Sequence, residues 1–266
     1  MALSCMQVNI NHCANAQDLM IQSIAEWQIG VTVVSEPYFI PDRNDWVSDH
    51  NKTVAIIAPA AAGSPSFENT VKGRGFVLAV LSGVAIIGVY FSPNRLLAEF
   101  EQSLTEVGAL IRQISPVPVI VAGDFNAKST AWGCPATDVR GDVLEEWAIS
   151  LGLTILNTGS ESTCVRPQGE SIVDITFASD ALARRIQNWR VEAEVESLSD
   201  HRYIRYDLTT LPVTGRNVRF AAGDSPKWIL GKLNRELAKE AAIVESWGSV
   251  NERINTELEA ESQAMR

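Results

Sequence analysis

Short runs of aliphatic, mostly β-branched residues recur along the chain, and they limit the folds that it can adopt. Such runs predict buried strands, because β-branched side chains pack well on a pleated surface and the runs are too short for helices. The runs are Val31–Val34, Val54–Ile57, Phe76–Leu81, Val84–Val89, Val117–Ala122 and Ile172–Phe177.

Two kinds of connection join these predicted strands. Ser82-Gly83 predicts a tight turn between two of them, whereas stretches with apolar residues at helical spacing lie between others. The helical stretches cover residues 16–27, 96–114 and 142–152. Hairpins join antiparallel neighbours and helical crossovers join parallel ones. The prediction is therefore an α/β (α+β) protein with mixed sheets and helices outside them.

The pattern changes after Leu208. Residues 209–225 contain Pro and Gly without a clear period, which predicts a linker. Residues 226–266 are charged, with a thin apolar stripe at helical spacing. We therefore predict one domain over residues 1–208, followed by a linker and a helical segment over 209–266.

The charge distribution narrows the classes of partner. The net charge is −10, and residues 1–208 hold 14 Lys and Arg against 24 Asp and Glu, while the rest holds 8 of each. Passive nucleic-acid-binding modules are usually basic. Either polyanions are not the partner, or a bound cation and a local basic face offset the bulk charge.

Cysteine usage and hydropathy indicate the compartment. The four cysteines are scattered and form no C-x-x-C pair, which favours reduced thiols over disulfides or a zinc site. No apolar run is long enough to span a membrane, and the first residues do not resemble a secretory signal. These features predict a cytosolic or nuclear protein without a membrane partner.

Acidic and amide side chains recur where the predicted strands end. Loops at one end of a sheet are where rigid scaffolds usually place their active sites, so we expect these side chains to converge. Asp124 and Asn126 are two positions apart and should share one face of an extended segment. The strand-end residues are Asn9, Asn11, Glu36, Tyr90, Asn94, Asp124, Asn126, Asp174 and Asp200-His201.

Four converging carboxylates predict a bound cation, because they cannot all stay ionised side by side without one. Oxygen donors from Glu, Asp and Asn suit Mg²⁺ or Mn²⁺ and fit Zn²⁺ poorly. One histidine beside them can change charge near neutral pH, and it can donate to a phosphate oxygen or carry a proton.

Each motif also has an ordinary structural explanation. The stretch GDFN could be a turn, Ser-Asp before His201 could cap a helix or turn, and Glu36 could be an exposed loop acid. It is the order of the motifs and their shared position at strand ends that favour function. The other histidines are predicted at the surface and three tryptophans in packing roles: His12, His50, Trp132, Trp147 and Trp189.

Six segments in this order resemble the endonuclease/exonuclease/phosphatase superfamily: MQVNIN, SEPY, VYFSPN, GDFNA, SIVDITF and LSDHR. They are most similar to the endonuclease domain of non-LTR retrotransposons, in which Glu-Pro-Tyr follows the second strand and GDFNA…WG comes later. The resemblance covers about residues 6–208. It implies a four-layer αββα sandwich of two mixed β-sheets, and it implies that residues 209–266 lead to a reverse transcriptase domain, which is absent here.

The resemblance implies catalytic roles for five residues. Asp124 would orient or deprotonate the attacking water, and Asn126 would hold the phosphate. The hydroxyl of Tyr90 would lie near the scissile phosphate. Asp174 would hydrogen-bond the catalytic His201.

The resemblance also implies a divalent-metal site with Mg²⁺, Mn²⁺ being possible. Glu36 would bind the metal, Asn9 would help to position metal and phosphate, and Asp200 would be a further acid nearby. Because adjacent side chains on a strand point apart, Asp200 should not itself orient His201, and a partner from another strand is expected.

Substrate contacts are predicted on the loops that flank these motifs. Residues 165–171 resemble a hairpin that enters DNA in relatives and biases the choice of target. Flanking cations offered as phosphate contacts are Arg43, Lys72, Arg74, Lys128, Arg140, Arg166 and Arg202. The predicted substrate-binding residues are Asn11, Tyr38, Asn94, Lys128, Thr163, Arg166, Gln168 and Ser171.

The implied function is a metal-dependent DNA endonuclease that nicks one strand of double-stranded target DNA. In-line attack of water would leave a 5′-phosphate and a 3′-hydroxyl, which primes reverse transcription by the reverse transcriptase domain of the same polyprotein. The implied substrate predicts a nuclear location. The alternatives are a phosphatase of the same superfamily acting on a lipid or inositol phosphate, and a non-catalytic domain that keeps the fold.

Overall fold

The computed structural model describes residues 2–60 and 63–209. Of the predicted linker and helical segment, all but Thr209 lies outside these described residues. None of the helices within the described ranges has the length and apolar character needed to cross a bilayer.

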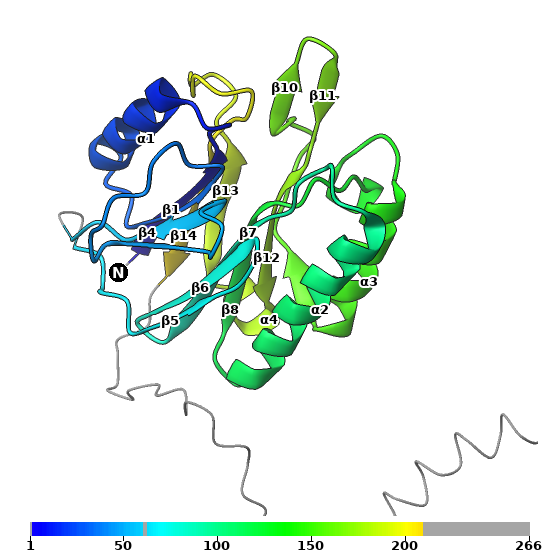
Figure 1. Cartoon of the computed structure of the whole chain (residues 1–266), viewed down its shortest axis with the longest axis horizontal. Helices are drawn as coiled ribbons and strands as arrows, with labels where there is room; N and C mark the ends of the chain where they lie inside the picture. Colours follow the sequence, from blue (N-terminus) through cyan, green and yellow to red (C-terminus); the bar gives the residue numbers. More distant parts are fainter. Residues whose placement is uncertain (1, 61–62, 210–266) are drawn as a thin grey trace, which may run out of the picture. The chain divides into compact units, whose positions relative to one another are not determined.

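Two six-stranded mixed sheets form the centre of the domain (Figure 1). Sheet A contains, in spatial order, β13 (Ile186–Val191), β14 (Ile204–Thr209), β1 (Ala2–Asn9), β2 (Val31–Ser35), β4 (Val54–Ile57) and β3 (Trp46–Ser48). Sheet B contains β5 (Asn69–Lys72), β6 (Phe76–Leu81), β7 (Val84–Tyr90), β8 (Val119–Asp124), β12 (Asp174–Ser179) and β9 (Leu153–Ile155).

Each sheet contains one parallel pair among antiparallel neighbours. The parallel pairs are β1 with β2 and β7 with β8. The first is connected through helix α1 (Ala14–Glu26) and the second through helix α2 (Leu97–Ile114). Helical crossovers produce parallel neighbours, so the predicted mixed sheets follow directly from the order of strands and helices.

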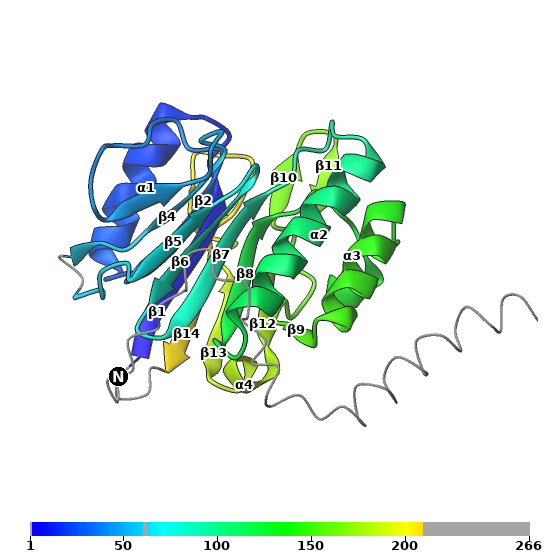
Figure 2. The ribbon, with the colours of Figure 1, turned by 60° about the horizontal axis from the view of Figure 1, so that its bottom comes forward.

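Helices cover the outer faces of both sheets (Figure 2). Helix α1 packs on sheet A through Met20 and Ile24. Helix α2 and helix α3 (Val139–Ser150) pack on sheet B, with Phe100 and Leu144 fully buried. The inner faces of the two sheets meet in a further apolar layer that includes Ile56. The predicted four-layer αββα sandwich is confirmed.

Three small elements complete the described chain. They are the 3₁₀ turn η2 (Thr130–Trp132), the short helix α4 (Asp180–Ala183), and an antiparallel hairpin of β10 (Cys164–Arg166) and β11 (Gly169–Ser171). The hairpin predicted over residues 165–171 is therefore present, and in Figure 1 it projects beyond the ends of both sheets. The stretch around its turn, from Arg166 to Glu170, is exposed.

Two strands are shifted by two residues from their predicted ranges. β8 begins at Val119, because Pro118 has no N–H to donate to a ladder. β12 begins at Asp174, because the hydroxyl of Thr163 accepts hydrogen bonds from the backbone N–H groups of Val173 and Asp174. As a result, Asp124 is the last residue of β8 and Asp174 is the first residue of β12.

Gly123 permits close contact between β7 and β8. Its φ is 143°, and a Cβ at this position would lie 2.0 Å from the carbonyl oxygen of Val89. Only glycine adopts this conformation without strain and leaves room for the neighbouring backbone. The residue before Asp124 is thus fixed by the packing of the sheet.

Candidate active site

The ends of several strands meet at one edge of the sandwich. In sheet A, Asn9 ends β1 and Glu36 directly follows β2, which runs parallel to it. In sheet B, Tyr90 and Asp124 end the parallel strands β7 and β8 and are register partners. Asp174, which begins the antiparallel strand β12, pairs with Asp124. The carboxyl ends of parallel strands share one edge, so the topology itself gathers these side chains.

Asn9 bridges two carboxylates. Its Nδ2 donates to Glu36 Oε2 and to Asp124 Oδ2, both at 2.9 Å. The two acids come from different sheets and are separated by a single amide nitrogen. Its Oδ1 accepts from the backbone N–H of Asn11 at 2.8 Å. Asn9 was predicted to help position a metal, but in this structure its amide oxygen is engaged by the backbone.

Glu36 is held in an uncommon backbone conformation. Its φ is 49°, in the left-handed region that residues other than Gly, Asn and Asp rarely adopt. The hydroxyl of Tyr90 donates to Glu36 Oε1 at 2.6 Å. Burial and the Glu36 carboxylate raise the pKa of Tyr90, so that it remains a donor at neutral pH. Backbone strain of this kind concentrates at functional sites.

Phe125 anchors the GDFN motif. It is completely buried, with ring centroids 5.8 Å from Phe91 and 5.6 Å from Phe177 in edge-to-face contacts. Asn126 does not continue the extended segment that was predicted, because its φ is 48°. Its backbone N–H instead donates to Asp124 Oδ1 at 2.9 Å. The motif therefore contains the end of β8 and a turn, and the turn directs the backbone N–H of Asn126 to the buried carboxylate of Asp124.

The environment of Asp124 raises the affinity of its carboxylate for a proton. The residue is 1 % exposed. Burial raises the pKa of its carboxyl, and the nearby charge of Asp174 raises it further, while His201 and the hydrogen bonds from Asn9 and Asn126 oppose the rise. A buried acid with a raised pKa beside other acids is suited to accept a proton or to sit beside a cation.

Asp174 and His201 form a buried pair. His201 Nδ1 lies 2.7 Å from Asp174 Oδ2, and the two side chains are 1 % and 2 % exposed. Burial lowers the pKa of His201, but the charge and hydrogen bond of Asp174 outweigh it and raise the pKa overall. His201 was predicted to be oriented by a residue from another strand, and Asp174 on β12 has that position. Because Nδ1 is bonded to Asp174, Nε2 is the ring nitrogen that can donate a proton to a substrate or bind a metal ion.

Asp200 lies with Arg166 and His201 rather than in the group that Asn9 bridges. Arg166 Nε hydrogen-bonds Asp200 Oδ2, and Asn11 Nδ2 lies 3.4 Å from Oδ1. Burial raises the pKa of Asp200, yet the hydrogen bond from Arg166 and the charge of His201 bring it below its usual range. Its charge is therefore partly balanced by a cation of the hairpin.

A hard divalent cation fits the group around Glu36 and Asp124. Two carboxylates from facing sheets approach the same amide nitrogen, and carboxylate oxygens are the donors that Mg²⁺ and Mn²⁺ prefer. Asp124, Asp174 and His201 also offer ligand atoms within 4.8 Å of one another. In that second set, one Asp174 oxygen and Nδ1 of His201 already bond each other, so the Glu36–Asp124 group suits a hard ion better.

Comparison with known proteins finds similarity to retrotransposon proteins. A family model described as endonuclease-reverse transcriptase matches residues 84–205. A putative 115 kDa protein in the type-1 retrotransposable element R1DM of Drosophila melanogaster is 26% identical over an alignment of 229 positions, which covers 79% of this chain and 22% of that protein. The endonuclease domain of TRAS1, a telomere-specific non-LTR retrotransposon, has 26% identity and a TM-score of 0.64, over 79% of this chain and 99% of that domain.

In sequence and fold, the chain resembles the endonuclease domains of non-LTR retrotransposons. A similar fold occurs in a more distant protein. A 3′ phosphatase, NExo, from Neisseria, solved with a product DNA hairpin, matches with 18% identity and a TM-score of 0.64, over 78% of this chain and 99% of that one. This chain spans about a fifth of the length of the Drosophila relative.

Three of the predicted substrate-binding residues line one cavity beside the hairpin: Lys128, Arg166 and Ser171. A cavity of about 390 Å³ beside the hairpin is lined by Asn126, Lys128, Arg166 and Ser171 among others. Thr163 does not fit the prediction: it is 0 % exposed, and its hydroxyl serves the start of β12. The remaining predicted contacts are exposed: Asn11, Tyr38, Asn94 and Gln168.

Besides Arg166, which pairs with Asp200, three of the cations offered as phosphate contacts are engaged within the protein. Arg140 donates to the backbone carbonyls of Ser92, Pro93 and Arg95, which fastens the loop after β7. Arg43 pairs with Asp45, and Arg202 donates to the carbonyl of Ser162. Their donors hold loops in place, so structural roles fit these arginines better than DNA contact.

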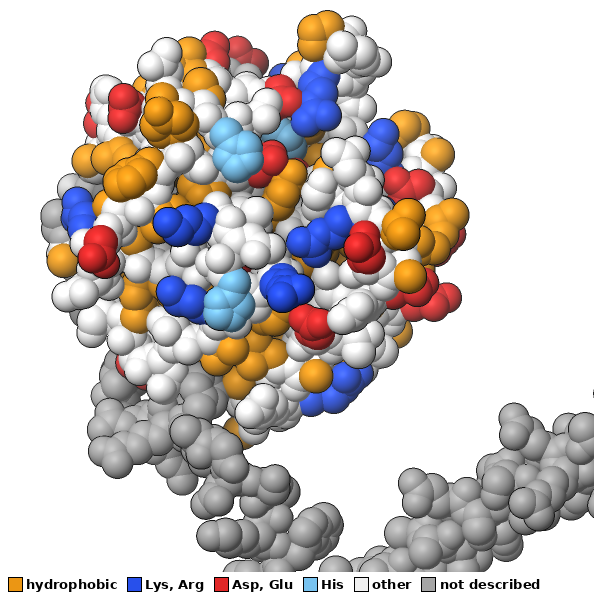
Figure 3. Space-filling view, in the orientation of Figure 1, with side chains coloured by type: hydrophobic (Ala, Val, Ile, Leu, Met, Phe, Trp, Pro, Cys, Tyr) orange, Lys and Arg blue, Asp and Glu red, His pale blue; other side chains and the backbone are white. Residues whose placement is uncertain are grey.

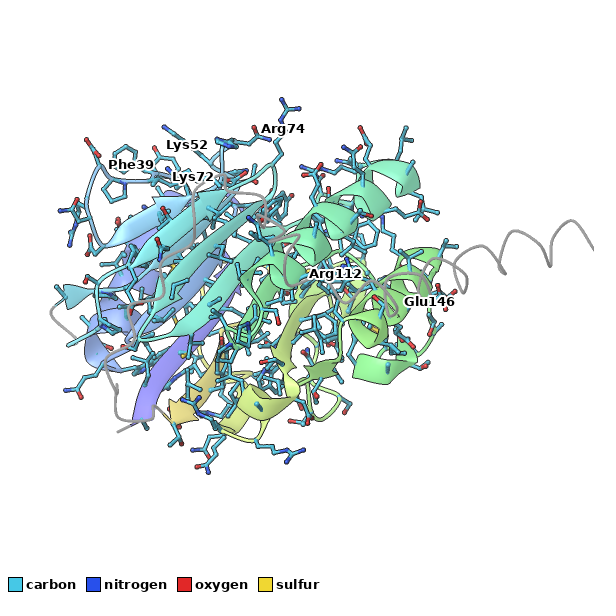
Figure 4. The ribbon with its side chains drawn as sticks, turned by 90° about the horizontal axis from the view of Figure 1, so that it is seen from below. Phe39, Lys52, Lys72, Arg74, Arg112 and Glu146 are labelled. Atoms are coloured by element: carbon cyan, nitrogen blue, oxygen red, sulfur yellow. The ribbon has the colours of Figure 1, made fainter. Side chains whose placement is uncertain are left out.

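A basic rim of Lys52, Lys72 and Arg74 borders the site on the side of β5 and β6. All three side chains are exposed, and Figure 4 shows them along one edge of the domain. Figure 3 shows several Lys and Arg side chains on the face drawn in Figure 1. The bulk charge is acidic, but these exposed cations give this face a local basic surface.

Asp49 connects the basic rim to the site, and its role was not predicted. It is 2 % exposed, and its carboxylate accepts from the backbone N–H groups of Thr53, Val54 and Gly75. Thr53 in turn accepts from the N–H of Glu36, and Gly75 accepts from that of Tyr90. Only the folded loops bring these groups together, so no local sequence signal marked Asp49.

His12 also lies closer to the site than predicted. Its Nε2 is 3.5 Å from Glu36 Oε1, although its side chain is 57% exposed. Its backbone N–H donates to the carbonyl of Glu36 at 2.9 Å. Its position three residues after Asn9, in the turn that closes β1, was the available signal.

Proposed function

We propose that this domain is a divalent-metal-dependent endonuclease that hydrolyses one phosphodiester of double-stranded DNA and leaves a 3′-hydroxyl. The observation that carries the proposal is the convergence of two groups at one edge of the sandwich. One is the Glu36–Asn9–Asp124 bridge, and the other is the buried Asp174–His201 pair.

The residues of this site supply most of the required chemistry. Asp124 is suited to hold the attacking water and accept its proton, because its raised pKa brings its affinity for a proton closer to neutral pH. His201, positively charged beside Asp174, donates from Nε2 to a non-bridging phosphate oxygen. The half-buried Asn126 offers a further donor at the same edge, and the hydroxyl of Tyr90 holds the Glu36 carboxylate by donating to it. Mg²⁺ or Mn²⁺ held by Glu36 and Asp124 would stabilise negative charge on the phosphate.

The DNA would lie between the basic rim and the hairpin. Exposed cations on both sides of an acidic centre suit a polyanion whose phosphates bind at the rim while one is brought to the centre. Arg166 and Gln168 on the hairpin are the side chains placed to influence target choice. In this proposal the nicked strand primes a reverse transcriptase domain of the same polyprotein, which places the reaction in the nucleus.

The defining experiment is a nicking assay on supercoiled plasmid with the full chain and Mg²⁺. We expect conversion to open circles that stops with a chelator and resumes when Mg²⁺ or Mn²⁺ is added in excess. Mapping the ends should show 3′-hydroxyl groups. Release of inorganic phosphate from 3′-phosphorylated DNA or from inositol phosphates, without nicking, would assign a phosphatase instead.

Metal binding should also stabilise the fold. Saturating Mn²⁺ should raise the melting temperature by about 5 °C, because an ion that binds only the folded state adds its binding free energy to the stability. Glu36→Gln should remove most of this shift, since it deletes one of the two carboxylates. Glu146→Gln, an exposed change on α3, should keep the full shift (Figure 4). Equal shifts in the two variants would show that the ion binds elsewhere.

A further inference from the structure

Cys164, Asp200 and His201 form a second cluster of possible metal ligands, with a different chemistry from the Glu36–Asp124 group. The thiol sulfur of Cys164, a carboxylate oxygen of Asp200 and a ring nitrogen of His201 all lie within 4.8 Å of one another. Sulfur and imidazole are ligands that Zn²⁺ prefers and that Mg²⁺ avoids.

The backbone holds these three side chains together. Cys164 and His201 form an antiparallel bridge, which joins the base of the hairpin to the segment before β14. Val165 N–H donates to the carbonyl of Asp200 at 2.7 Å, and Arg202 N–H donates to that of Thr163 at 2.8 Å. The ligand positions are therefore set by the fold and do not depend on ordering a loop when an ion binds.

His201 already has the orientation of a metal-binding histidine. Its Nδ1 is hydrogen-bonded to the Asp174 carboxylate, and its Nε2 faces Asp200 Oδ1 at 3.9 Å. A carboxylate behind the imidazole is the arrangement found around many zinc ligands, where it fixes the ring and increases its basicity. Ligands at about 2.0–2.3 Å from a tetrahedral ion lie some 3.5 Å apart, so small side-chain movements suffice.

The carboxylate of Asp200 can serve the ion and the hairpin together. Arg166 binds its Oδ2, whereas Oδ1 is the oxygen on the side of His201. The cavity of about 390 Å³ beside the hairpin reaches Cys164 and Arg166, which gives an ion a path to the buried thiol. A water molecule from this cavity would complete four ligands around the ion.

We propose that Cys164, Asp200 and His201 bind Zn²⁺, and that the bound ion inhibits the nuclease. The inhibition rests on the proposed function, since zinc would occupy the Nε2 that His201 needs for the phosphate. Zinc binding itself does not rest on it. The spacing of the cysteines in the sequence predicted reduced thiols and no zinc site. That prediction missed this ligand set because it contains a single cysteine, which comes close to His201 only when the hairpin is folded.

Binding is tested with Co²⁺, whose bonds to thiolate sulfur give a charge-transfer absorption in the near ultraviolet. The full chain, freed of metal and reduced, should show this absorption with saturation at one equivalent, and Zn²⁺ should abolish it. Cys164→Ser should lack the absorption, and the matched control Cys13→Ser should retain it. The proposal is overturned if wild-type protein gives no saturable signal, or if Cys164→Ser keeps it.

Asp200→Asn is a second variant, because Cys164 is buried and its substitution can disturb the hairpin. Asp200 is only half-buried, and its loss should weaken Zn²⁺ binding by at least about 10-fold while leaving the cobalt–thiolate absorption detectable. An unchanged Zn²⁺ affinity in this variant would exclude Asp200 from the ligand set.

Inhibition is tested by adding Zn²⁺ to the plasmid assay in the presence of excess Mg²⁺. Micromolar Zn²⁺ should stop nicking by wild type and by Cys13→Ser. Relative to its own zinc-free rate, Cys164→Ser should need at least about 10-fold more. Equal sensitivity of the variants would overturn the inhibitory role. Absence of nicking before zinc is added would contradict the proposed function, and the cobalt titration would still decide on binding.

Discussion

Asp124→Asn is expected to reduce the nicking rate by at least about 10³-fold, because a proton-transfer group alone contributes about 10²–10⁴ and this variant also loses a metal-binding charge. Asparagine fills nearly the same volume but cannot accept a proton from water. The rate should be measured under single-turnover conditions with saturating Mg²⁺. DNA affinity, measured separately without metal, should stay the same or increase, since one negative charge beside the phosphate is removed.

The matched control for this variant is Asp18→Asn. Asp18 is exposed on α1, and the same chemical change there should leave the nicking rate within about twofold of wild type. The melting temperatures of both variants show whether the fold is intact. If folded Asp124→Asn nicks at more than a tenth of the wild-type rate, the buried acid is neither base nor metal ligand, and the mechanism proposed for this site is wrong.

Gly123→Ala is expected to lower the free energy of unfolding by roughly 4 kcal/mol, in the range of the most disruptive point mutations. A Cβ would lie 2.0 Å from the carbonyl oxygen of Val89, which is backbone and cannot move without breaking the β7–β8 pairing. For a domain of this size, the loss corresponds to a fall in melting temperature of about 8–16 °C.

Gly152→Ala separates crowding from backbone strain. Gly152 also has a positive φ, of 62°, but a Cβ there would meet no atom within 4 Å. The expected cost is only about 1 kcal/mol, from the unfavourable backbone conformation. Equal losses in the two variants, measured by urea denaturation, would mean that the contact with Val89 relaxes easily.

The sequence predicted the layered fold because its strands carry strong local signals. The buried runs around Ile56, Ile86 and Val121 alternate with amphipathic helices, and this order alone gives two mixed sheets with helices outside. By contrast, β3 and β9 have only three residues each, and Trp46–Ser48 shows no period of its own. These strands exist because a neighbouring strand pairs with them, which is a tertiary effect.

The site could be predicted to the level of which strand ends meet, but not to the level of each contact. Placing Asp124 and Glu36 at strand ends was enough to bring them together. The side chain of Thr163 points into the protein because its hydroxyl accepts a hydrogen bond from the first residue of β12. His12 lies beside Glu36 because Asn11 and His12 both have positive φ values in the turn after β1. Such details arise from turn conformations, which residue type constrains only weakly.

The hairpin of β10 and β11 has a consequence for how relatives of this domain can diverge. The stretch around its turn is exposed, although Gly169, with a φ of 143°, has a backbone conformation that other residues adopt only with strain. Apart from Gly169, the exposed residues at its tip are therefore under little selection for folding stability, whereas its base is paired with the segment that contains His201. We therefore expect the tip of the hairpin to vary among similar domains, and its base, which pairs with His201, to vary less.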